Sequence, residues 1–459
     1  MAQLSLQNAT SCCVKKNTTS SRVFCSKCDF KSCFHIMSYR FSKFYIISHA
    51  FNPLRLRVGG SLEDQTVYKV GLVTKCPHFK NNMNVRRFGF SNGCITMERW
   101  DQLNQFFNET GAKVTFVLNA LRENKSENKN STLWVGNWNK LNAQEFMKYT
   151  ISKGYKIDSY ELGNELSASG VFARVNAGQY GKDTIILSNL VKKLYANFSD
   201  QPKILGPGGF YDKEWFNKFL RVSGPGIVDG LTHHIYNLGA ANYLVMYAGN
   251  DPKLISRVQD PFYLDKIAQT FKSISESIKQ YGPWTGAWVG ESGGAYHSGG
   301  TNLGMASTFD HKVYCRQVLI GGNYGLLNTT TFAHNPDYYG ALLWHRLMGS
   351  RVLHDASPYL HSYAHCDITV LLINMSNSTT FVVNTVNDLN LFPSDHTELP
   401  PREDQVVLLN DTPLKLTKTM EIPNLNPALV SPLEPIKVAP DSFVFAVLRG
   451  FGAPACSSS

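Results

Sequence analysis

Two glutamates stand where apolar segments of the sequence end. Glu165 closes the segment Tyr160-Glu-Leu-Gly-Asn-Glu165, and Glu291 follows Trp288-Val-Gly290. Two carboxyl groups that meet over one glycosidic bond can divide its cleavage, because one protonates the leaving oxygen while the other attacks the anomeric carbon. Asn164, beside Glu165, can hydrogen-bond a sugar hydroxyl next to the reacting carbon.

Neither glutamate is diagnostic by itself. Asn-Glu and Gly-Glu-Ser are common in turns and helix caps, so only their joint position favours a catalytic pair. A metal site is the competing chemistry, but no HExxH or His-x-His ligand set accompanies the two acids. His233 and His234 could cap a strand as a packed pair. With Tyr236 they are predicted to line a sugar site instead.

The segments that must position these residues alternate between strands and helices over about 300 residues. Strands are predicted at residues 54–58, 114–118, 159–162, 203–205, 231–235, 287–289 and 313–317. Helices are predicted around residues 100–107, 143–153, 187–194, 215–220, 264–279 and 338–347. This order indicates a (β/α)8 barrel, in which catalytic side chains emerge at the carboxyl ends of the strands. Counting one further strand before residue 54, Glu165 and Glu291 are expected at the ends of the fourth and seventh strands.

Two barrel elements are not identifiable in the sequence. No strand is recognised upstream of Leu54, where the first barrel strand is expected. Between Glu291 and Val313, a Gly-rich stretch leaves little room for a crossover helix, which with its loops needs about ten to twelve residues. We therefore expect a barrel that lacks one strand and one helix.

The chain is predicted to have three parts. Residues 1–50 form an atypical basic, Cys-rich segment that we expect to be disordered, and residues 51–350 form the barrel. Residues 351–459 show short strand patterns separated by Pro, Asn and Asp turns, which is typical of a β-sandwich. Residues 391–402 are predicted to be a Pro-rich loop.

Composition excludes several classes of protein. Of the 459 residues, 43% are hydrophobic and 17% charged, which excludes a wholly disordered chain. No apolar run approaches the roughly 18 residues that span a bilayer. The net charge is +10, and residues 1–50 carry seven Lys or Arg against Asp29 alone. The rest is mildly basic, without the basic stripe and interleaved aromatics of a nucleic-acid surface.

Cysteines are as unevenly distributed as the charge. Five lie in the first 33 residues, and the spacing Cys25-x2-Cys28-x4-Cys33-x-His35 superficially resembles a zinc site. We favour a disordered segment, because the second pair has the wrong spacing for a finger or ribbon. Asn-x-Ser/Thr sequences favour a secretory route, although residues 1–50 contain no apolar signal-peptide core. Examples of these sequences begin at Asn108, Asn130, Asn197, Asn328 and Asn377.

Several motifs in order resemble the plant heparanase-like proteins of glycoside hydrolase family 79. They occupy residues 54–61, 160–165, 231–236, 289–296 and 313–324, and the resemblance extends from about Phe51 to Cys456. It implies a retaining β-glucuronidase with a (β/α)8 barrel and a β-sandwich, and with neither metal nor organic cofactor. Glu165 would be the proton donor and Glu291 the nucleophile.

The resemblance also implies roles for other residues. Asn164 matches the asparagine beside the proton donor, and Tyr236 matches a tyrosine that orients the nucleophile. Sugar contacts are implied for Ser61, His234, Tyr296, Gly322 and Tyr324. Cys366 and Cys456 match a cysteine pair that bridges the sandwich in relatives.

The implied partner is a glucuronic-acid-containing glycan, such as an arabinogalactan, or a flavonoid glucuronide. Relatives are secreted to the cell wall or the vacuole, and some associate peripherally with membranes. This chain departs from their pattern in residues 1–50 and in a shortened segment after Tyr296. Those departures motivate an alternative, a catalytically impaired protein that binds carbohydrate on the same fold.

Overall fold

The computed structural model describes most of the chain. The described residues are 2–5, 23–29, 50–51, 53–79, 92–128, 131–236, 257, 260–293, 298–320, 325–328, 331–349, 352–356, 359–366, 369–386, 394–399, 408–410, 412–414, 422–431 and 434–448.

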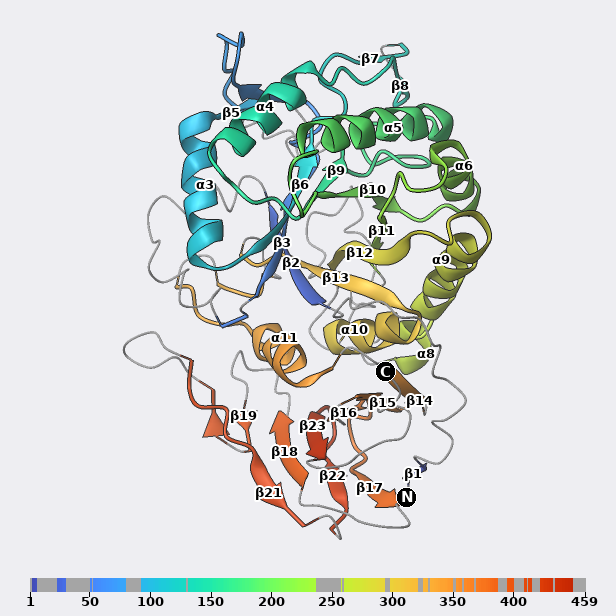
Figure 1. Cartoon of the computed structure of the whole chain (residues 1–459). Coiled ribbons are helices and arrows are strands. Elements are labelled where there is room, and N and C mark those ends of the chain that lie inside the picture. Colours follow the sequence, from blue (N-terminus) through green and yellow to red (C-terminus); the bar gives the residue numbers. More distant parts are fainter. Residues whose placement is uncertain are drawn as a thin grey trace.

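Eight parallel strands close into a barrel (Figure 1). In chain order they are β2 (Val23–Asp29), β3 (Arg55–Gly59), β6 (Lys113–Leu118), β9 (Ser159–Leu162), β10 (Lys203–Phe210), β11 (Gly230–Tyr236), β12 (Gly286–Gly293) and β13 (His311–Gln317). Each strand pairs with the next, and β13 pairs with β2. The predicted barrel architecture is confirmed, and the seven predicted strands all lie within it.

The prediction that no barrel strand precedes Leu54 is wrong. β2 pairs with β13 from Val23↔Val313 to Gln317↔Lys27, and with β3 from Cys25↔Arg55 to Asp29↔Gly59. This strand falls inside the segment 1–50 that we expected to be disordered. Its lysine and cysteines break the apolar pattern by which the other strands are recognised, so local periodicity did not reveal it.

Helices surround the barrel on its outer side (Figure 1). They are α3 (Met97–Glu109), α4 (Leu141–Ser152), α5 (Ala177–Leu194), α6 (Lys213–Ser223), α8 (Pro261–Leu264), α9 (Ile267–Tyr281), α10 (Ser298–Thr308) and α11 (Pro336–Leu347). Helix α10 corrects the prediction that the crossover between β12 and β13 lacks a helix. Its glycines have low helix propensity, but Leu303, Met305 and Ala306 are buried, so tertiary packing supports the helix.

The two faces of the barrel strands are buried differently. Side chains that face outward, such as Leu56, Val58 and Phe116, belong to the main core with the helices. A small separate cluster inside the barrel consists of Leu205, Trp288, Val313 and Cys315. The Arg55 guanidinium carbon lies 5.0 Å from the centroid of the Trp288 ring, and Arg55 pairs with Asp158. The barrel interior therefore also carries charge.

The C-terminal domain consists of two facing sheets, as the sequence predicted. One sheet has the order β14-β15-β16-β23-β18-β21 and the other β1-β17-β22, and β19 pairs with β20. The bounds are β1 (Ala2–Ser5), β14 (Val352–Ala356), β15 (Leu360–His365), β16 (Thr369–Asn374), β17 (Phe381–Val386), β18 (Ser394–Leu399), β19 (Leu408–Leu409), β20 (Thr412–Pro413), β21 (Ala428–Val430), β22 (Ile436–Val438) and β23 (Phe443–Leu448). Leu372 and Val444 from the first sheet share a core with Val383 and Val438 from the second.

Two sandwich strands lie in segments that we did not expect to form strands. β1 lies within residues 1–50, which we expected to be disordered, and it pairs with β17. β18 lies within residues 391–402, which we expected to be a loop, and it pairs with both β21 and β23. Prolines on both sides suggested a loop, whereas pairing with two distant strands supplies the hydrogen bonds of a strand. The domain packs beside α10 and α11 (Figure 1). Gly304 of α10 makes this contact, since a Cβ there would lie 2.4 Å from the Tyr363 ring.

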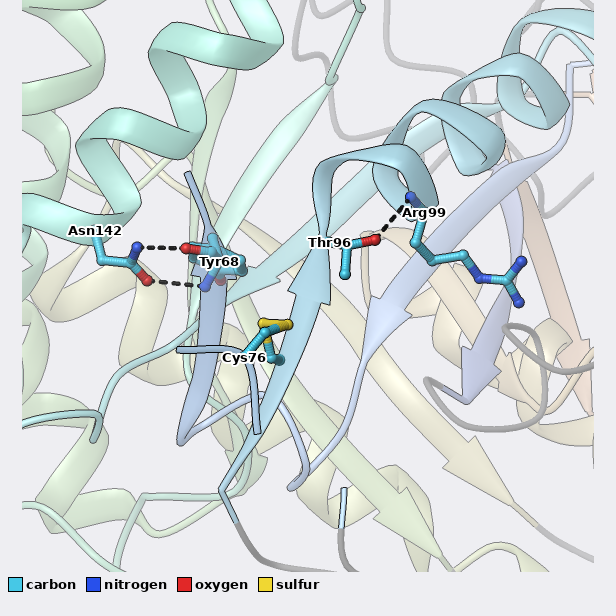
Figure 2. Close-up of a disulfide and its surroundings, with 6 residues drawn as sticks. Tyr68, Cys76, Thr96, Arg99 and Asn142 are labelled. Atoms are coloured by element: carbon cyan, nitrogen blue, oxygen red, sulfur yellow. Dashed lines mark hydrogen bonds between the residues drawn. A yellow bond between two sulfur atoms is a disulfide. The ribbon is translucent and has the colours of Figure 1, made fainter. Parts of the chain in front are cut away.

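A small two-stranded unit beside the barrel is cross-linked by a disulfide. β4 (Thr66–Lys69) and β5 (Gly93–Thr96) are parallel, and Cys76 is bonded to Cys94 (Figure 2). The amide of Asn142 on α4 exchanges two hydrogen bonds with the backbone of Tyr68, at 3.0 and 2.8 Å. A second small pair is formed by β7 (Lys125–Ser126) and β8 (Trp134–Val135).

Cys366 is also disulfide-bonded. Its predicted partner, Cys456, lies outside the described residues, as do Cys33 and His35 of the zinc hypothesis. The Cys366–Cys456 pairing therefore stays a prediction. Among the described helices, none has the length and apolarity needed to cross a membrane.

Candidate active site

The barrel brings the two predicted glutamates together at one end. Glu165 lies three residues beyond β9, and Glu291 lies near the carboxyl end of β12. These are the fourth and seventh barrel strands counted from β2. One oxygen of each carboxylate and a ring nitrogen of His234 all lie within 4.8 Å of one another. Both acids can therefore reach a single small group.

The backbone at Glu165 adopts a conformation that its side chain disfavours. Glu165 has φ 56° and Gly163 has φ 70°, both in the left-handed region. A Cβ at residue 163 would lie 2.6 Å from Leu166 and 2.7 Å from Ala120, so this turn requires glycine. The Glu165 N–H donates to the Gly208 carbonyl at 2.7 Å, which holds the turn in place. A strained non-glycine residue that its surroundings hold in place is typical of functional sites.

Glu291 is turned into the barrel mouth by irregular pairing. The register of β12 shifts against β11 at His233/His234 and against β13 between Val289 and Ser292. Such bulges redirect a side chain without ending the strand. The Glu291 carboxylate is 4% exposed and accepts hydrogen bonds from the Tyr236 hydroxyl and from Arg57 Nη1, the latter at 3.3 Å.

Arg57 on β3 connects the two sides of the site. Its guanidinium donates to Glu161 at 2.7 Å, to Glu291 at 3.3 Å and to the Asn164 side-chain carbonyl at 3.1 Å. Burial opposes the charge on Arg57, but the neighbouring carboxylates Glu161 and Glu291 outweigh it and raise the pKa of the guanidinium. The site thus holds a permanent cation beside two acids.

The predicted site residues that the structure describes lie here, with the exception of His233. His234 Nδ1 is 2.9 Å from Glu165 Oε1, and the Tyr236 hydroxyl also hydrogen-bonds the side-chain amide of Gln317. The Asn164 amide donates to Ser61 Oγ at 3.3 Å. His233, by contrast, points away and hydrogen-bonds His311, which matches the packed-histidine alternative for this residue alone. Three predicted contacts, Tyr296, Gly322 and Tyr324, lie outside the described residues.

Five residues of the site were not predicted from the sequence: Arg57, Asp64, Glu161, Phe210 and Gln317. Asp64 is fully buried and accepts the Asn164 N–H at 2.9 Å. Its burial, helped by the negative charge of Glu165, raises the pKa of its carboxyl well above the usual value. Charged residues within strands that are covered on both faces must be paired, and this was the available signal for Arg57 and Glu161.

Glu165, His234 and Glu291 could also hold a divalent cation, since each offers one ligand atom. The Arg57 guanidinium, 3.3 Å from Glu291 Oε2, opposes this arrangement because it places a positive charge next to the ion. The same three groups satisfy the geometry of acid–base and nucleophilic catalysis without a metal.

The comparisons with known proteins agree with this architecture. Residues 23–314 match the family described as Glycosyl hydrolase family 79, N-terminal domain, and this match begins at the first residue of β2. Heparanase-like protein 2 of Arabidopsis thaliana is 45% identical over 467 residues, covering 89% of this chain and 84% of that protein. Baicalin-beta-D-glucuronidase of Scutellaria baicalensis is 35% identical over 441 residues, covering 87% and 81%.

Solved structures share the fold at low sequence identity. A 4-O-alpha-L-rhamnosyl-beta-D-glucuronidase from Fusarium oxysporum 12S superposes with a TM-score of 0.63 at 14% identity, covering 95% of this chain and 98% of that chain. The GH51 arabinofuranosidase from Xanthomonas axonopodis pv. citri gives 0.61 at 15% identity, covering 88% and 89%. Since the family match spans more than half of the sequence, this chain belongs to glycoside hydrolase family 79 and is a glycosidase of the heparanase-like and β-glucuronidase group.

Proposed function

We propose that this glycosidase hydrolyses β-glucuronosyl linkages with retention of configuration, with Glu165 as acid/base and Glu291 as nucleophile. The observation that carries the proposal is the approach of the two carboxylates to within 4.8 Å. Retaining glycosidases hold their carboxyl groups about 5–5.5 Å apart, whereas inverting enzymes leave about 6.5–9.5 Å for a water molecule.

The hydrogen-bond donors around each acid support this division of roles. Glu291 accepts from Arg57 and Tyr236, which favour a charged carboxylate and aim its oxygen. Glu165 faces His234 Nδ1 and receives no contact from the guanidinium at hydrogen-bond distance. It is therefore the carboxyl group that can carry a proton to the leaving oxygen.

The reaction then follows in two steps. In the first, a Glu291 oxygen bonds to the anomeric carbon while the bond from that carbon to the leaving oxygen breaks, and the Glu165 proton passes to the leaving oxygen. In the second, water attacks the anomeric carbon and gives its proton to Glu165, and the ester bond to Glu291 breaks. Both carboxyl groups return to their starting state.

A β-glucuronide is the substrate class that the relatives support, because one of them is a baicalin β-D-glucuronidase and is 35% identical to this chain. Flavonoid glucuronides and glucuronic acid on arabinogalactan are the specific candidates. Phe210 at the end of β10 is 37% exposed, with its ring centroid 6.4 Å from that of His234. An exposed ring there offers an apolar face to the group next to the sugar.

The direct test is hydrolysis of 4-nitrophenyl β-D-glucuronide, with the first-formed anomer read by proton NMR. The β-anomer is expected first, and the matching β-glucoside should react far more slowly. Glu291→Ala should lose activity roughly a thousandfold or more, whereas Glu276→Ala, on the exposed side of α9, should not. An α-anomer as first product, or full turnover by Glu291→Ala, refutes the assignment.

The alternative of a carbohydrate-binding protein without turnover rested on two missing elements. β2 and α10 occupy both positions, so the motive for this alternative is removed. Binding of a glucuronide without product formation would restore it.

We also propose that the protein functions in an oxidising secretory compartment such as the cell wall or the vacuole. The Cys76–Cys94 disulfide supports this. So does the exposure of the sequon residues Asn108, Asn197, Asn328 and Asn377. The test is a mobility shift after N-glycosidase treatment of plant-expressed protein, combined with fractionation of wall, vacuole and salt-washed membranes. Unglycosylated protein in the cytosolic fraction contradicts the proposal.

A further inference from the structure

A buried ion pair lies behind the two catalytic acids. Arg57 and Glu161 are 1% and 0% exposed, and their side chains meet inside the barrel from β3 and β9. The two-step reaction uses neither residue directly. A buried pair by itself is weak evidence of stabilisation, because desolvation can offset the attraction between the charges. The geometry of this pair indicates another role.

Each of three guanidinium nitrogens of Arg57 has its own acceptor. Nε donates to Glu161 Oε2 at 2.7 Å, Nη1 to Glu291 Oε2 at 3.3 Å, and Nη2 to Asn164 Oδ1 at 3.1 Å. The guanidinium is planar and rigid, so anchoring Nε fixes the directions of both η nitrogens. The shortest of the three bonds is the anchor, and the two longer ones reach the site.

Glu161 is itself held in one position. Its second oxygen, Oε1, accepts from the Thr232 hydroxyl at 2.6 Å, and the Gly208 N–H donates to that hydroxyl at 2.8 Å. Gly208 has φ 58°, and a Cβ there would lie 2.8 Å from Glu161 Oε1. The Gly208 carbonyl in turn accepts the Glu165 N–H. One glycine therefore supports both the anchor and the acid/base residue.

We propose that Glu161 is a positioning residue that acts through Arg57, setting the guanidinium so that it holds the nucleophile and the sugar-binding amide of Asn164 at once. This inference rests on the proposed function, in which Glu291 attacks the anomeric carbon. It adds that the placement of a third glutamate, outside the reacting pair, controls the rate.

Two variants separate position from charge. Glu161→Asp keeps the charge but shortens the side chain by one methylene, so Arg57 is drawn away from the site. Glu161→Gln removes the charge but keeps the length, and its amide can accept from Arg57 Nε and donate to Thr232. We expect kcat to fall roughly 100-fold in Glu161→Asp, as for a displacement of about 1 Å. Glu161→Gln should stay within about tenfold of wild type, and KM should change only a few-fold in both.

Asp158→Asn is the matched control. It removes the carboxylate partner of Arg55, the other barrel arginine on β3, at a contact of 2.5 Å. Arg55 and Asp158 lie at the amino-terminal ends of their strands, whereas Glu291 lies near the carboxyl end of β12. The control should therefore lower the melting temperature and leave kcat unchanged. Activity is normalised to the fraction of protein alkylated on Glu291 by an epoxide analogue of the glucuronic acid ring, located by peptide mass spectrometry.

The rank order decides the result. The inference is supported if kcat is much lower in Glu161→Asp than in Glu161→Gln, and if both variants are as thermostable as Asp158→Asn. Glu161→Gln slower than Glu161→Asp, or lost thermostability with normal kcat in both, overturns it and leaves the proposed function intact. If the wild-type protein is alkylated but shows no turnover, the rates of alkylation of Glu161→Asp and Glu161→Gln are compared in place of kcat, and the same order is expected. Wild type that is neither alkylated nor active overturns the proposed function and this inference together.

Discussion

Replacing Asp183 with asparagine should stabilise the protein at neutral pH but not at acidic pH. Asp183 on α5 is 4% exposed and accepts hydrogen bonds from the Trp138 N–H at 3.0 Å and from the Gln179 amide at 2.9 Å. Burial raises the pKa of its carboxyl from 3.8 to about 6, although the hydrogen bonds from Trp138 and Gln179 act to lower it. The folded state therefore binds this proton more tightly than the unfolded state.

The sign and the size of the effect follow from linkage. The stabilising contribution of the protonated carboxyl is complete below pH 3.8 and is lost as the pH rises through about 6. The whole shift corresponds to about 3 kcal/mol. Partial solvent screening reduces this, so we expect about 1–2 kcal/mol. Asparagine keeps an oxygen for Trp138 and removes the charge, so the variant should recover this amount at pH 7.5.

The assay is the melting temperature of wild type and Asp183→Asn between pH 4 and pH 8. For a chain of this size a gain of about 1–2 kcal/mol corresponds to roughly 1–3 °C at pH 7.5, and the difference should shrink toward zero near pH 4. Asp200→Asn, on an exposed turn, is the control and should match wild type throughout. A difference between Asp183→Asn and wild type that does not vary with pH would refute the reasoning, because it could not arise from titration.

Four further outcomes are expected. Burial lowers the pKa of His334 to about 3, so its stabilising contribution is present above pH 6.5 and is lost as the pH falls; His334→Gln should flatten the acid side of the melting-temperature profile, and an unchanged slope counts against this. Gly208→Ala places a methyl group against Glu161 at a left-handed φ, so kcat should fall at least tenfold, and normal kcat with normal thermostability would contradict the packing. Replacing Cys76 and Cys94 by serine removes a cross-link across 18 residues; a loss of about 3 kcal/mol is expected, and equal melting of the variant and wild type would be inconsistent with a structural bond. Hydrolysis should survive dialysis against EDTA, because Arg57 supplies the positive charge beside Glu291; loss of activity that Zn²⁺ or Mg²⁺ restores would instead favour a metal on Glu165, His234 and Glu291.

Local sequence patterns were sufficient for much of the architecture. Short strand-like segments predicted seven barrel strands, and helical spacing predicted a helix around residues 100–107, where Trp100, Leu103 and Phe106 are buried in α3. The order of strands and helices predicted the barrel, and the rule for strand ends then placed Glu165 and Glu291 in one site. These features could be predicted because each depends on neighbours a few residues apart, or on a topology that many sequences share.

Tertiary structure alone decided how the site is built. Arg57 is 104 residues from Glu161 and 234 from Glu291 in the sequence, so no local pattern could assign its three acceptors. β2 and α10 exist because strand pairing and buried contacts outweigh weak local propensity. The left-handed backbone at Glu165 is likewise imposed by Gly208 from another strand. The sequence by itself determined which two acids share one site, whereas long-range packing determined the cation, the glycine and the strained turn that hold them there.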